Sequence, residues 1–236
     1  MKKNTLLKNT FILIFGGMIT KILGFIIKIL YTRYLKEEGL SLITLVFPTY
    51  SLLLTLSGFA LPLAATKLIA QNKKRKSTIF FNSLYITLCI DFILIILVVL
   101  FSKYFSLYLL KDIRCSYLII ILAINLPFVS VTSILKSYYF GIEKVIPISL
   151  SNIFEEIIKI ILIIYILPKI ILRSIVLGVI TYLFINIICE ICSFIILHLF
   201  LPKKICINKL SYKYNFIKTT QNGEKTIYSY LLDKYL

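Results

Sequence analysis

The sequence predicts an all-α protein, a polytopic membrane bundle of six transmembrane helices. First, 59% of its 236 residues are hydrophobic, whereas roughly half are apolar in a soluble domain. Second, the runs rich in isoleucine, leucine and phenylalanine reach about 20 residues, the length that crosses a hydrocarbon core. Third, no run alternates apolar and polar residues over about ten positions, as a membrane β-barrel strand does. Helices then remain as the structure that satisfies the backbone in lipid.

The first predicted span covers about residues 9–33 and contains two lysines in an otherwise apolar stretch. At about 100° per residue, these lysines fall on one helical stripe with two glycines. The stripe consists of Gly17, Lys21, Gly24 and Lys28. Lysine in hydrocarbon is costly unless it faces a bundle interior or water, so the stripe is expected to face a polar cavity. Snorkelling of the lysine stem to the headgroups is the alternative, and it fits Lys28 better than Lys21.

The next three spans are predicted over about residues 40–66, 79–101 and 116–140, and prolines mark bends in two of them. Pro48 and Pro62 lie in the second span and Pro127 lies in the fourth. Proline frees a backbone carbonyl and bends a helix, so these positions fit ordinary membrane-helix kinks or gating bends equally well. Gly141 and Pro147 predict a tight turn into the next span.

The fifth and sixth spans, about residues 148–167 and 174–199, carry most of the charge expected inside the membrane. Glu155 and Lys159 form an i, i+4 pair with the carboxylate first, which is the favourable order. Asn186 and Glu190 share one stripe of the sixth span. These groups are interpreted either as cavity-lining residues or as a structural ion-pair cluster. Asp91 in the third span is a further buried carboxylate.

The distribution of positive charge distinguishes a membrane protein from a nucleic-acid-binding one. The formal net charge is +17, but the lysines and arginines gather at span ends and in short loops. Such positions predict contact with anionic headgroups and no nucleic-acid partner. By the positive-inside rule, both termini are expected in the cytoplasm. Two units are predicted, a six-helix transmembrane lobe over residues 1–205 and a basic cytoplasmic tail over residues 206–236.

Signals for catalysis, metals or cofactors are sparse. The five cysteines lie in or beside apolar spans or in the tail, so they offer no disulfide framework. Cys189 and Cys192 have redox or metal spacing but no neighbouring ligands, which favours a packing role. With one histidine and no acidic loop cluster beyond Glu37-Glu38, no Mg²⁺ site is evident. We expect no cofactor, no metal and no enzymatic activity.

A family resemblance rests on four segments: ITKILGFIIKI (19–29), YTRYLKEEGLSLITLVFPTYSLLLTLSGFALPLAATKLIA (31–70), ILKSYYFGIEKVIP (134–147) and SNIFEEIIKI (151–160). In order and spacing, over about residues 5–205, they resemble the stage V sporulation protein B group of polysaccharide transporters. This group belongs to the multidrug/oligosaccharidyl-lipid/polysaccharide exporter superfamily. The resemblance implies a flippase of undecaprenyl-pyrophosphate-linked saccharide in a bacterial cytoplasmic membrane, associated with spore cortex assembly.

The resemblance also implies site residues. Lys21 and Lys28 correspond to basic residues of the family's first helix. Lys136 stands where a later motif of the family has arginine. The implied cavity accepts an anionic headgroup and is expected to be net cationic. The candidate cavity residues are Lys21, Lys28, Arg33, Lys136, Glu155, Lys159 and Glu190. The candidate packing and kink residues are Gly17, Gly24, Pro48, Pro62, Pro127, Gly141 and Pro147.

Other interpretations remain open at this point. A cation-coupled multidrug antiporter lobe would use Asp91, Glu155 or Glu190 as its coupling carboxylate. A membrane-inserted remnant would have no activity. The family's transporters have about 12 to 14 helices in two lobes, so this chain is expected to be an N-terminal lobe, either truncated or working with a second polypeptide. A homodimer is expected to be weak without an anionic lipid headgroup, because two lysine stripes repel each other.

Overall fold

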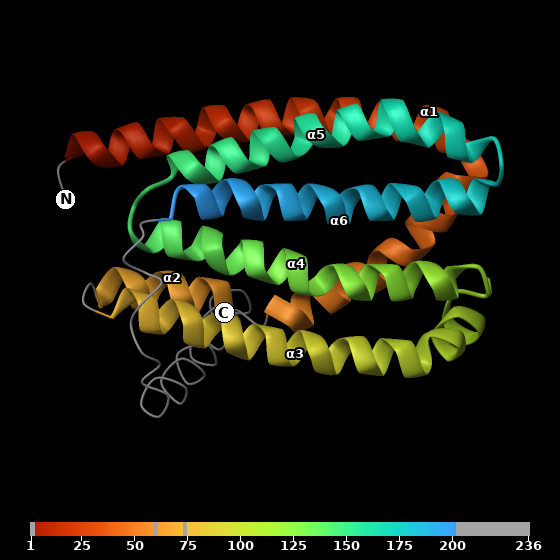
Figure 1. The fold of residues 1–236 in the computed structure, drawn as a ribbon, viewed down its shortest axis with the longest axis horizontal. Helices are drawn as coiled ribbons and strands as arrows, with labels where there is room; N and C mark the ends of the chain where they lie inside the picture. The colour runs from red at the N-terminus through yellow and green to blue at the C-terminus, as the bar shows by residue number, and fades with distance from the viewer. Residues whose placement is uncertain (1–2, 59–60, 73–74, 202–236) are drawn as a thin grey trace, which may run out of the picture.

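The described elements of the protein are all helical, which confirms the all-α class. The computed structural model describes residues 3–58, 61–72 and 75–201. The long helices run side by side along one axis (Figure 1). They are α1 (Lys3–Gly58), α2 (Leu61–Gln71), α3 (Lys76–Tyr104), the π-helix η1 (Phe105–Leu109), α4 (Cys115–Gly141), α5 (Ile146–Ile171) and α6 (Ile175–Leu199). The predicted tail at 206–236 lies outside the described residues.

Helix α1 consists of two helices joined at a bend. Lys36 has φ of 53° and ψ of −167°, which is not helical. The first half of α1 follows one edge of the bundle, and the second half returns from the far end (Figure 1). The bend falls between the predicted spans at 9–33 and 40–66. The second of these spans corresponds to the returning half of α1 together with the first residues of α2, and residues 59–60 between them are not described.

Four helical segments are apolar and long enough to cross a membrane: Leu7–Gln71, Lys76–Tyr108, Cys115–Gly141 and Ile175–Leu199. The first of them holds both halves of α1 as well as α2. Helix α5 is not among the four because Glu155, Glu156 and Lys159 lie in its middle. The protein is a multi-pass membrane protein, although the predicted six spans are not reproduced one by one. The start of α1 and the end of α6 lie at the same end of the bundle (Figure 1).

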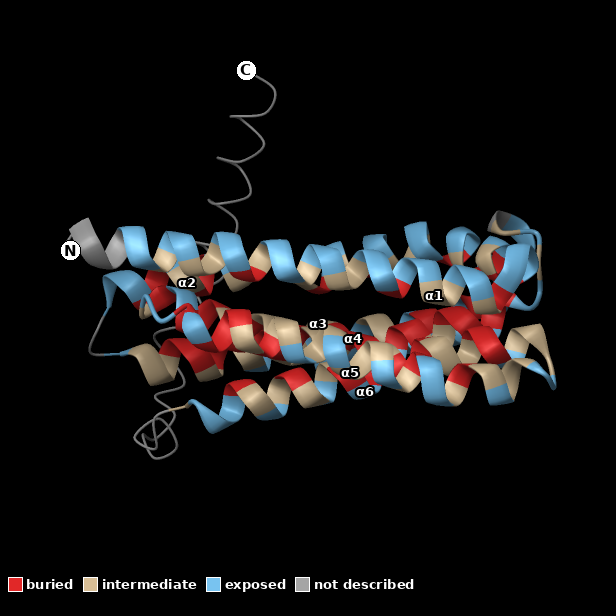
Figure 2. Cartoon of the chain, turned by 90° about the horizontal axis from the view of Figure 1, so that it is seen from above, coloured by how far each residue is buried: buried red, intermediate tan, exposed pale blue. Residues whose placement is uncertain are grey.

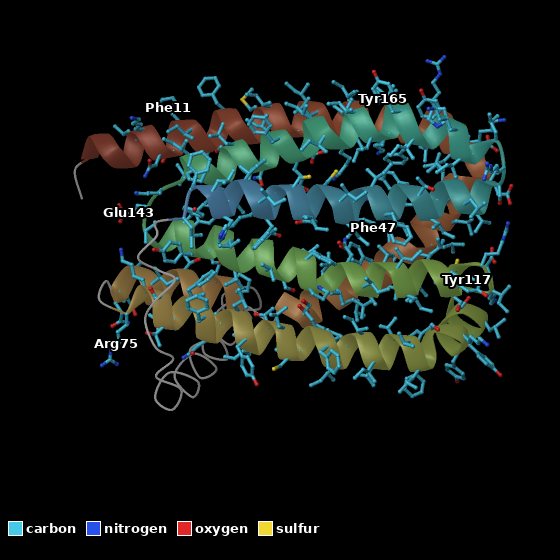
Figure 3. The ribbon with its side chains drawn as sticks, viewed as in Figure 1. Phe11, Phe47, Arg75, Tyr117, Glu143 and Tyr165 are labelled. Atoms are coloured by element: carbon cyan, nitrogen blue, oxygen red, sulfur yellow. The ribbon has the colours of Figure 1, made fainter. Side chains whose placement is uncertain are left out.

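Large apolar side chains cover much of the outside of the bundle, as lipid contact requires. Phe25 is 65% exposed and Leu100 is 71% exposed. Most of α1 is exposed along its outer side (Figure 2), and Phe11 and Tyr165 point away from the helices (Figure 3). Burial of apolar surface does not hold helices together in lipid, so the bundle depends on close packing and on internal polar contacts.

The interior is divided into two clusters of buried side chains. The larger cluster joins α1, α3, α4, α5 and α6 and includes Leu35, Leu126 and Leu167. The smaller one lies where α2, α3 and α4 meet, and Leu197 of α6 belongs to it. There the Tyr139 hydroxyl donates a hydrogen bond to the Leu197 carbonyl at 2.7 Å.

Two glycines permit close helix contacts. A Cβ on Gly141 of α4 would lie 2.7 Å from Cβ of Ile69 in α2, and a Cβ on Gly16 would lie 2.8 Å from Oγ of Ser149 in α5. These distances leave no space for a side chain. A Cβ on Gly17 or Gly24 would meet nothing within 4 Å. Among the described residues, Gly16 therefore makes the close contact of α1 with α5, and no described residue covers the face that carries Gly17 and Gly24.

The predicted prolines lie either inside helices or in the first turn of a helix, and their role as kinks stays a prediction. Pro48 is inside the returning half of α1 and Pro127 is inside α4. Pro62 is the second residue of α2, and Pro147 lies in the first turn of α5, where the missing amide hydrogen has no helical partner.

Candidate functional site

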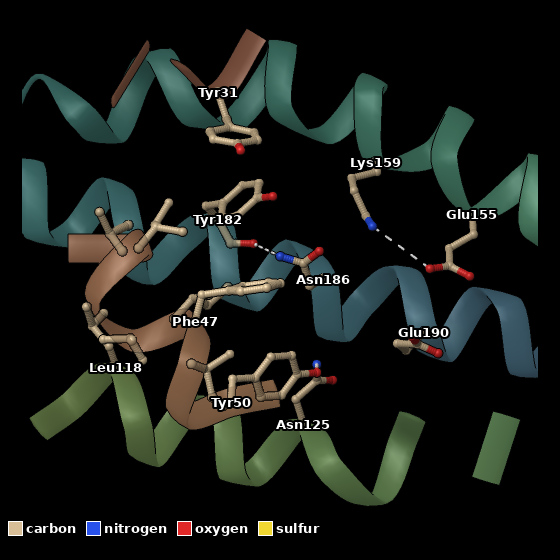
Figure 4. A pocket seen from close by; sticks show the side chains of 15 residues that line it. Tyr31, Phe47, Tyr50, Leu118, Asn125, Glu155, Lys159, Tyr182, Asn186 and Glu190 are labelled. Atoms are coloured by element: carbon tan, nitrogen blue, oxygen red, sulfur yellow. Dashed lines mark hydrogen bonds and ion pairs between the residues drawn. The ribbon is translucent and has the colours of Figure 1, made fainter. Parts of the chain in front are cut away.

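A cavity of about 200 Å³ lies between α1, α4, α5 and α6. The returning half of α1 contributes Phe47 and Tyr50, and the first half contributes Tyr31. Helix α4 contributes Asn125, and α5 and α6 contribute charged and amide side chains (Figure 4). The cavity exists because the bend at Lys36 returns α1 across the face of α4 and α6.

Tyrosine rings and amide groups form one wall of the cavity. The rings of Tyr31 and Tyr182 lie 5.0 Å apart between centroids and are tilted by 42°. The Asn125 amide donates a hydrogen bond to the Tyr50 hydroxyl at 2.9 Å, and the Asn186 amide donates to the Tyr182 carbonyl at 2.9 Å. The Oδ1 atom of Asn125 is buried and has no hydrogen-bond partner among the described residues. This wall therefore presents apolar rings beside unused hydrogen-bonding capacity.

A cluster of charged side chains forms the opposite wall and continues beyond it (Figure 4). The Glu155 carboxylate lies 3.9 Å from Nζ of Lys159 and 3.9 Å from Nζ of Lys136. Glu156 lies 4.0 Å from Lys159. The Thr132 hydroxyl donates a hydrogen bond to the Glu190 carboxylate at 2.8 Å. The structure thus brings together four of the predicted site residues, from three different helices.

The charge of this cluster differs from the expected net cationic cavity. Two lysines face three glutamates, and the cavity itself is lined by Glu155, Glu190 and Lys159. Ion pairs reduce the energetic penalty of holding charge in an apolar bundle, and here each lysine has a carboxylate within 4 Å. Lys136 and Lys159 could meet an anionic headgroup, but both are already paired with a carboxylate.

The three basic candidates of the first helix lie elsewhere. Lys21, Lys28 and Arg33 are exposed and do not line the cavity. Lys28 and Arg33 share a shallow surface hollow with Phe25. Their assignment to a substrate cavity stays a prediction, because no described part of this chain covers that face of α1.

Sequence reasoning missed the tyrosines of the cavity. Tyr31, Tyr50 and Tyr182 lie in separate spans, and in an apolar sequence with 16 tyrosines no periodic signal distinguishes them. Glu156 is missing from the candidate residues, although both Glu155 and Glu156 contact Lys159. Asn125 also lines the cavity and is missing from the candidate residues. The one available signal was its amide group within an otherwise apolar span.

Among the described residues, no three His, Cys, Asp or Glu side chains come together as metal ligands. The Cys189 thiol is buried in α6 and Cys192 is partly buried one turn later, and both are free.

An ion-pair group joins Glu38, near the bend of α1, to Asp112 and Arg114, which lie in the loop between two membrane-spanning segments. Arg114 lies 2.7 Å from a Glu38 carboxylate oxygen and 3.0 Å from an Asp112 carboxylate oxygen. The hydrogen bonds from Arg114 hold the pKa of Asp112 below its usual value. The group connects the bend of α1 to the loop before α4.

Comparisons with known proteins were consistent with a single family. The family described as "Polysaccharide biosynthesis protein" matches residues 6–231. Stage V sporulation protein B of Bacillus subtilis (strain 168) is 32% identical over 165 residues, 68% of this chain and 32% of that protein. Sporulation protein YkvU of the same organism is 24% identical over 169 residues, 66% of this chain and 35% of that protein. The chain thus spans about a third of the length of these curated relatives. No solved structure matches it.

Proposed function

The chain belongs to the polysaccharide biosynthesis protein family, and we propose that it is the part of a membrane flippase that binds a lipid-linked saccharide during its transfer across the bilayer. One observation carries the proposal. A cavity of tyrosine rings, amides and the Glu155–Lys159 pair lies inside a bundle with an apolar exterior. A small set of placed polar groups within apolar walls is the usual character of a ligand site.

The wall of rings and amides suits a sugar. The faces of Tyr31 and Tyr182 offer apolar surface to the C–H groups of a saccharide ring. Asn125 and Glu190 offer acceptors to its hydroxyl groups, and Asn125 Oδ1 has no competing partner in the described chain. Lys159 is the cation of the cavity and would meet a phosphate oxygen as a compact point charge.

The uncovered face of α1 suits a second lobe. Gly17 and Gly24 leave space for a close helix, and Lys21 and Lys28 would add positive charge to the shared interface. We infer that this face meets another polypeptide segment or a second copy of the chain. Lysines facing lysines repel, so a second copy would associate more strongly when an anionic polyprenyl pyrophosphate is present. Mass measurement of the protein–detergent particle with and without that lipid tests the point, and a monomer under both conditions would contradict self-pairing.

We further propose a bacterial cytoplasmic membrane as the location, with both termini in the cytoplasm. The support is the excess of lysine and arginine near the end of the bundle where α1 starts and α6 ends. The role is transport rather than bond-making chemistry, with lipids and the lipid-linked saccharide as partners.

Binding of the substrate tests the proposal most directly. The chain in lipid nanodiscs is titrated with a fluorescent undecaprenyl-pyrophosphate-linked saccharide, and binding is followed by fluorescence anisotropy. Lys159→Met is expected to weaken binding by roughly tenfold, the factor that about 1.4 kcal/mol makes in an equilibrium constant. Lys169→Met is the matched control, since Lys169 lies on the same helix but is exposed at its end.

Equal affinity of the two variants would exclude the cavity as the headgroup site. The double variant Lys21→Met, Lys28→Met, compared with Lys8→Met, then tests the alternative location on the open face of α1. A loss of binding confined to the double variant would move the headgroup to that face.

A cation-coupled exporter lobe is the second candidate function, favoured by the cavity's excess of carboxylate. Glu155 and Glu190 line the cavity and only one lysine does. A cavity with more carboxylates than lysines suits a cationic drug or a coupling cation better than an anionic ligand. Binding of a cationic dye such as ethidium, lost in Glu190→Gln and insensitive to the lipid-linked saccharide, would support this candidate.

A further inference from the structure

A second polar centre lies away from the cavity, around Asp91 of α3. The Asp91 side chain is 0% exposed. It is 15 residues after the first residue of α3, Lys76, which corresponds to about 22 Å at a rise of about 1.5 Å per residue. A similar length of helix follows it. Asp91 is therefore close to the midpoint of a helix that is long enough to cross a membrane.

Two serines from two other helices hold this carboxyl group. The hydroxyl of Ser57, at the end of α1, donates a hydrogen bond to Oδ1 of Asp91. The Ser57 and Ser130 hydroxyl oxygens lie 2.8 Å apart, and Ser130 belongs to α4. The other carboxyl oxygen, Oδ2, is buried and has no hydrogen-bond partner. Among the described residues, no lysine, arginine or histidine forms an ion pair with Asp91.

An ionised carboxylate in such a place would be highly unfavourable. Hydroxyl groups stabilise a negative charge but do not neutralise it, and a low-dielectric interior requires neutralisation by a cation or by a proton. Hard metal cations take about six oxygen ligands. Here the two hydroxyls contact each other and one carboxyl oxygen, and no group of three His, Cys, Asp or Glu side chains is found among the described residues. The geometry favours a proton.

A stripe of polar side chains leads from Asp91 toward the start of α3. Thr87 and Ser83 precede it in steps of four residues, so the three side chains lie on one helix face. Ser83 is 0% exposed and Thr87 is 1% exposed. The Ser83 hydroxyl, like Asp91 Oδ2, is buried without a hydrogen-bond partner. Buried polar atoms of this kind are the places where internal water molecules bind and bridge.

We propose that Asp91 is a proton-binding site, loaded and unloaded along the Ser83–Thr87 stripe from the end of the bundle where α3 begins. In uptake, a proton from water at that end bonds to Oδ2 and the carboxylate becomes a neutral acid; in release, that O–H bond breaks and the proton returns to water. Ser57 and Ser130 position the carboxyl group. They are the groups that face it from α1 and α4, and neither hydroxyl titrates near neutral pH.

Infrared spectroscopy of the full chain in nanodiscs at neutral pH tests the proton site. A protonated carboxyl group gives a C=O stretching band that a carboxylate lacks. Wild-type protein and the control variant Asp112→Asn, changed at the ion-paired loop, are expected to share one band component that Asp91→Asn lacks. Asp91→Asn is isosteric and keeps an acceptor for Ser57, so its folding is checked by circular dichroism. A carboxyl region identical in Asp91→Asn and wild type would overturn the proposal, and so would bound ²²Na⁺ that Asp91→Asn loses.

The route is tested by the rate at which this band shifts after transfer to D₂O. Ser83→Ala is expected to slow the shift by roughly tenfold, the factor that about 1.4 kcal/mol of added barrier makes. Ser193→Ala is the matched control, because the Ser193 hydroxyl is equally buried and equally without a partner, but it lies on α6. Equal exchange rates in the two variants would overturn the proposed route. The proton site itself would still be tested by the presence or absence of the C=O band. Neither measurement uses the lipid-linked saccharide, so failure here is distinct from failure of the transport proposal.

Discussion

The two polar centres of the bundle solve the same physical problem in different ways. On the side of α5 and α6, Glu155 lies between Lys136 and Lys159, and all three side chains remain partly exposed, at 13% to 24%. On the side of α3, Asp91 is 0% exposed, and its side-chain hydrogen-bonding neighbours among the described residues are the hydroxyls of Ser57 and Ser130. At the first centre, beside the cavity, lysines neutralise a carboxylate. At the second centre, a single carboxyl group is fully buried.

The difference teaches how polar groups persist in an apolar bundle. A charge can be kept where opposite charge and some water are near, and the resulting site can exchange partners with a ligand. A carboxyl group without a countercharge is tolerated only in its neutral form, which suits the transfer of a proton. Replacing a carboxyl group by an amide of the same shape should therefore destabilise the chain strongly at the first centre and very little at the second.

The largest effect is expected for Glu155→Gln. It removes the carboxylate shared by two lysines, so that Lys136 loses its ion-pair partner and Lys159 keeps only Glu156 at 4.0 Å. We expect the free energy of unfolding to fall by about 3 kcal/mol, measured by denaturant titration in detergent. Glu156→Gln is the control, because Glu156 has one lysine contact at 4.0 Å, and its loss should be smaller. Equal losses would contradict the central role of Glu155.

The next largest effect is expected where α4 packs against α2. Gly141→Ala places a methyl group 2.7 Å from Cβ of Ile69, an atom close to the backbone of α2 that cannot move aside easily. We expect a loss of about 1.5 kcal/mol from overpacking. Gly17→Ala, on the open face of α1, should change stability by about 0.5 kcal/mol or less, because nothing lies within 4 Å. A comparable loss at Gly17 in the purified chain would mean that another copy covers that face.

A smaller effect is expected for Asp91→Asn. A neutral amide replaces a neutral acid of the same shape, and Ser57 keeps its acceptor. Stability at neutral pH should therefore change by about 0.5 kcal/mol or less, in contrast to Glu155→Gln. A clear gain in stability would show instead that Asp91 is an uncompensated carboxylate in the native state.

The smallest effect is the pH dependence at the loop end. Because Arg114 lowers the pKa of Asp112, this contact stabilises the folded chain at pH values above 3.8, the usual pKa of Asp. The stabilisation is lost as the pH falls through the lowered pKa of Asp112. Thermal unfolding between neutral pH and pH 3 should show a slightly shallower acid decline in Arg114→Gln than in wild type. An identical decline would mean that the exposed ion pairs contribute nothing measurable, which is common at surfaces.

Much of the fold could be predicted from the sequence because the bilayer restricts the possibilities. Apolar runs of sufficient length define membrane helices, and the bend near Lys36 falls in a predicted loop. The Glu155–Lys159 contact follows from i, i+4 spacing on a single helix. Membership of the polysaccharide biosynthesis family also follows from linear motifs, and the family match confirms it.

The tertiary structure alone decided which faces meet. In a soluble helix the apolar stripe marks the side that packs, but these helices are apolar on every side, so periodicity does not distinguish lipid from protein. For that reason the sequence could place Lys21 and Lys28 on a common stripe without revealing that this chain leaves them exposed. For the same reason Gly16 rather than Gly17 contacts α5. The joining of Lys136 to Glu155, and of Asp91 to Ser57 and Ser130, depends on helix contacts between residues far apart in the sequence, which local spacing does not encode.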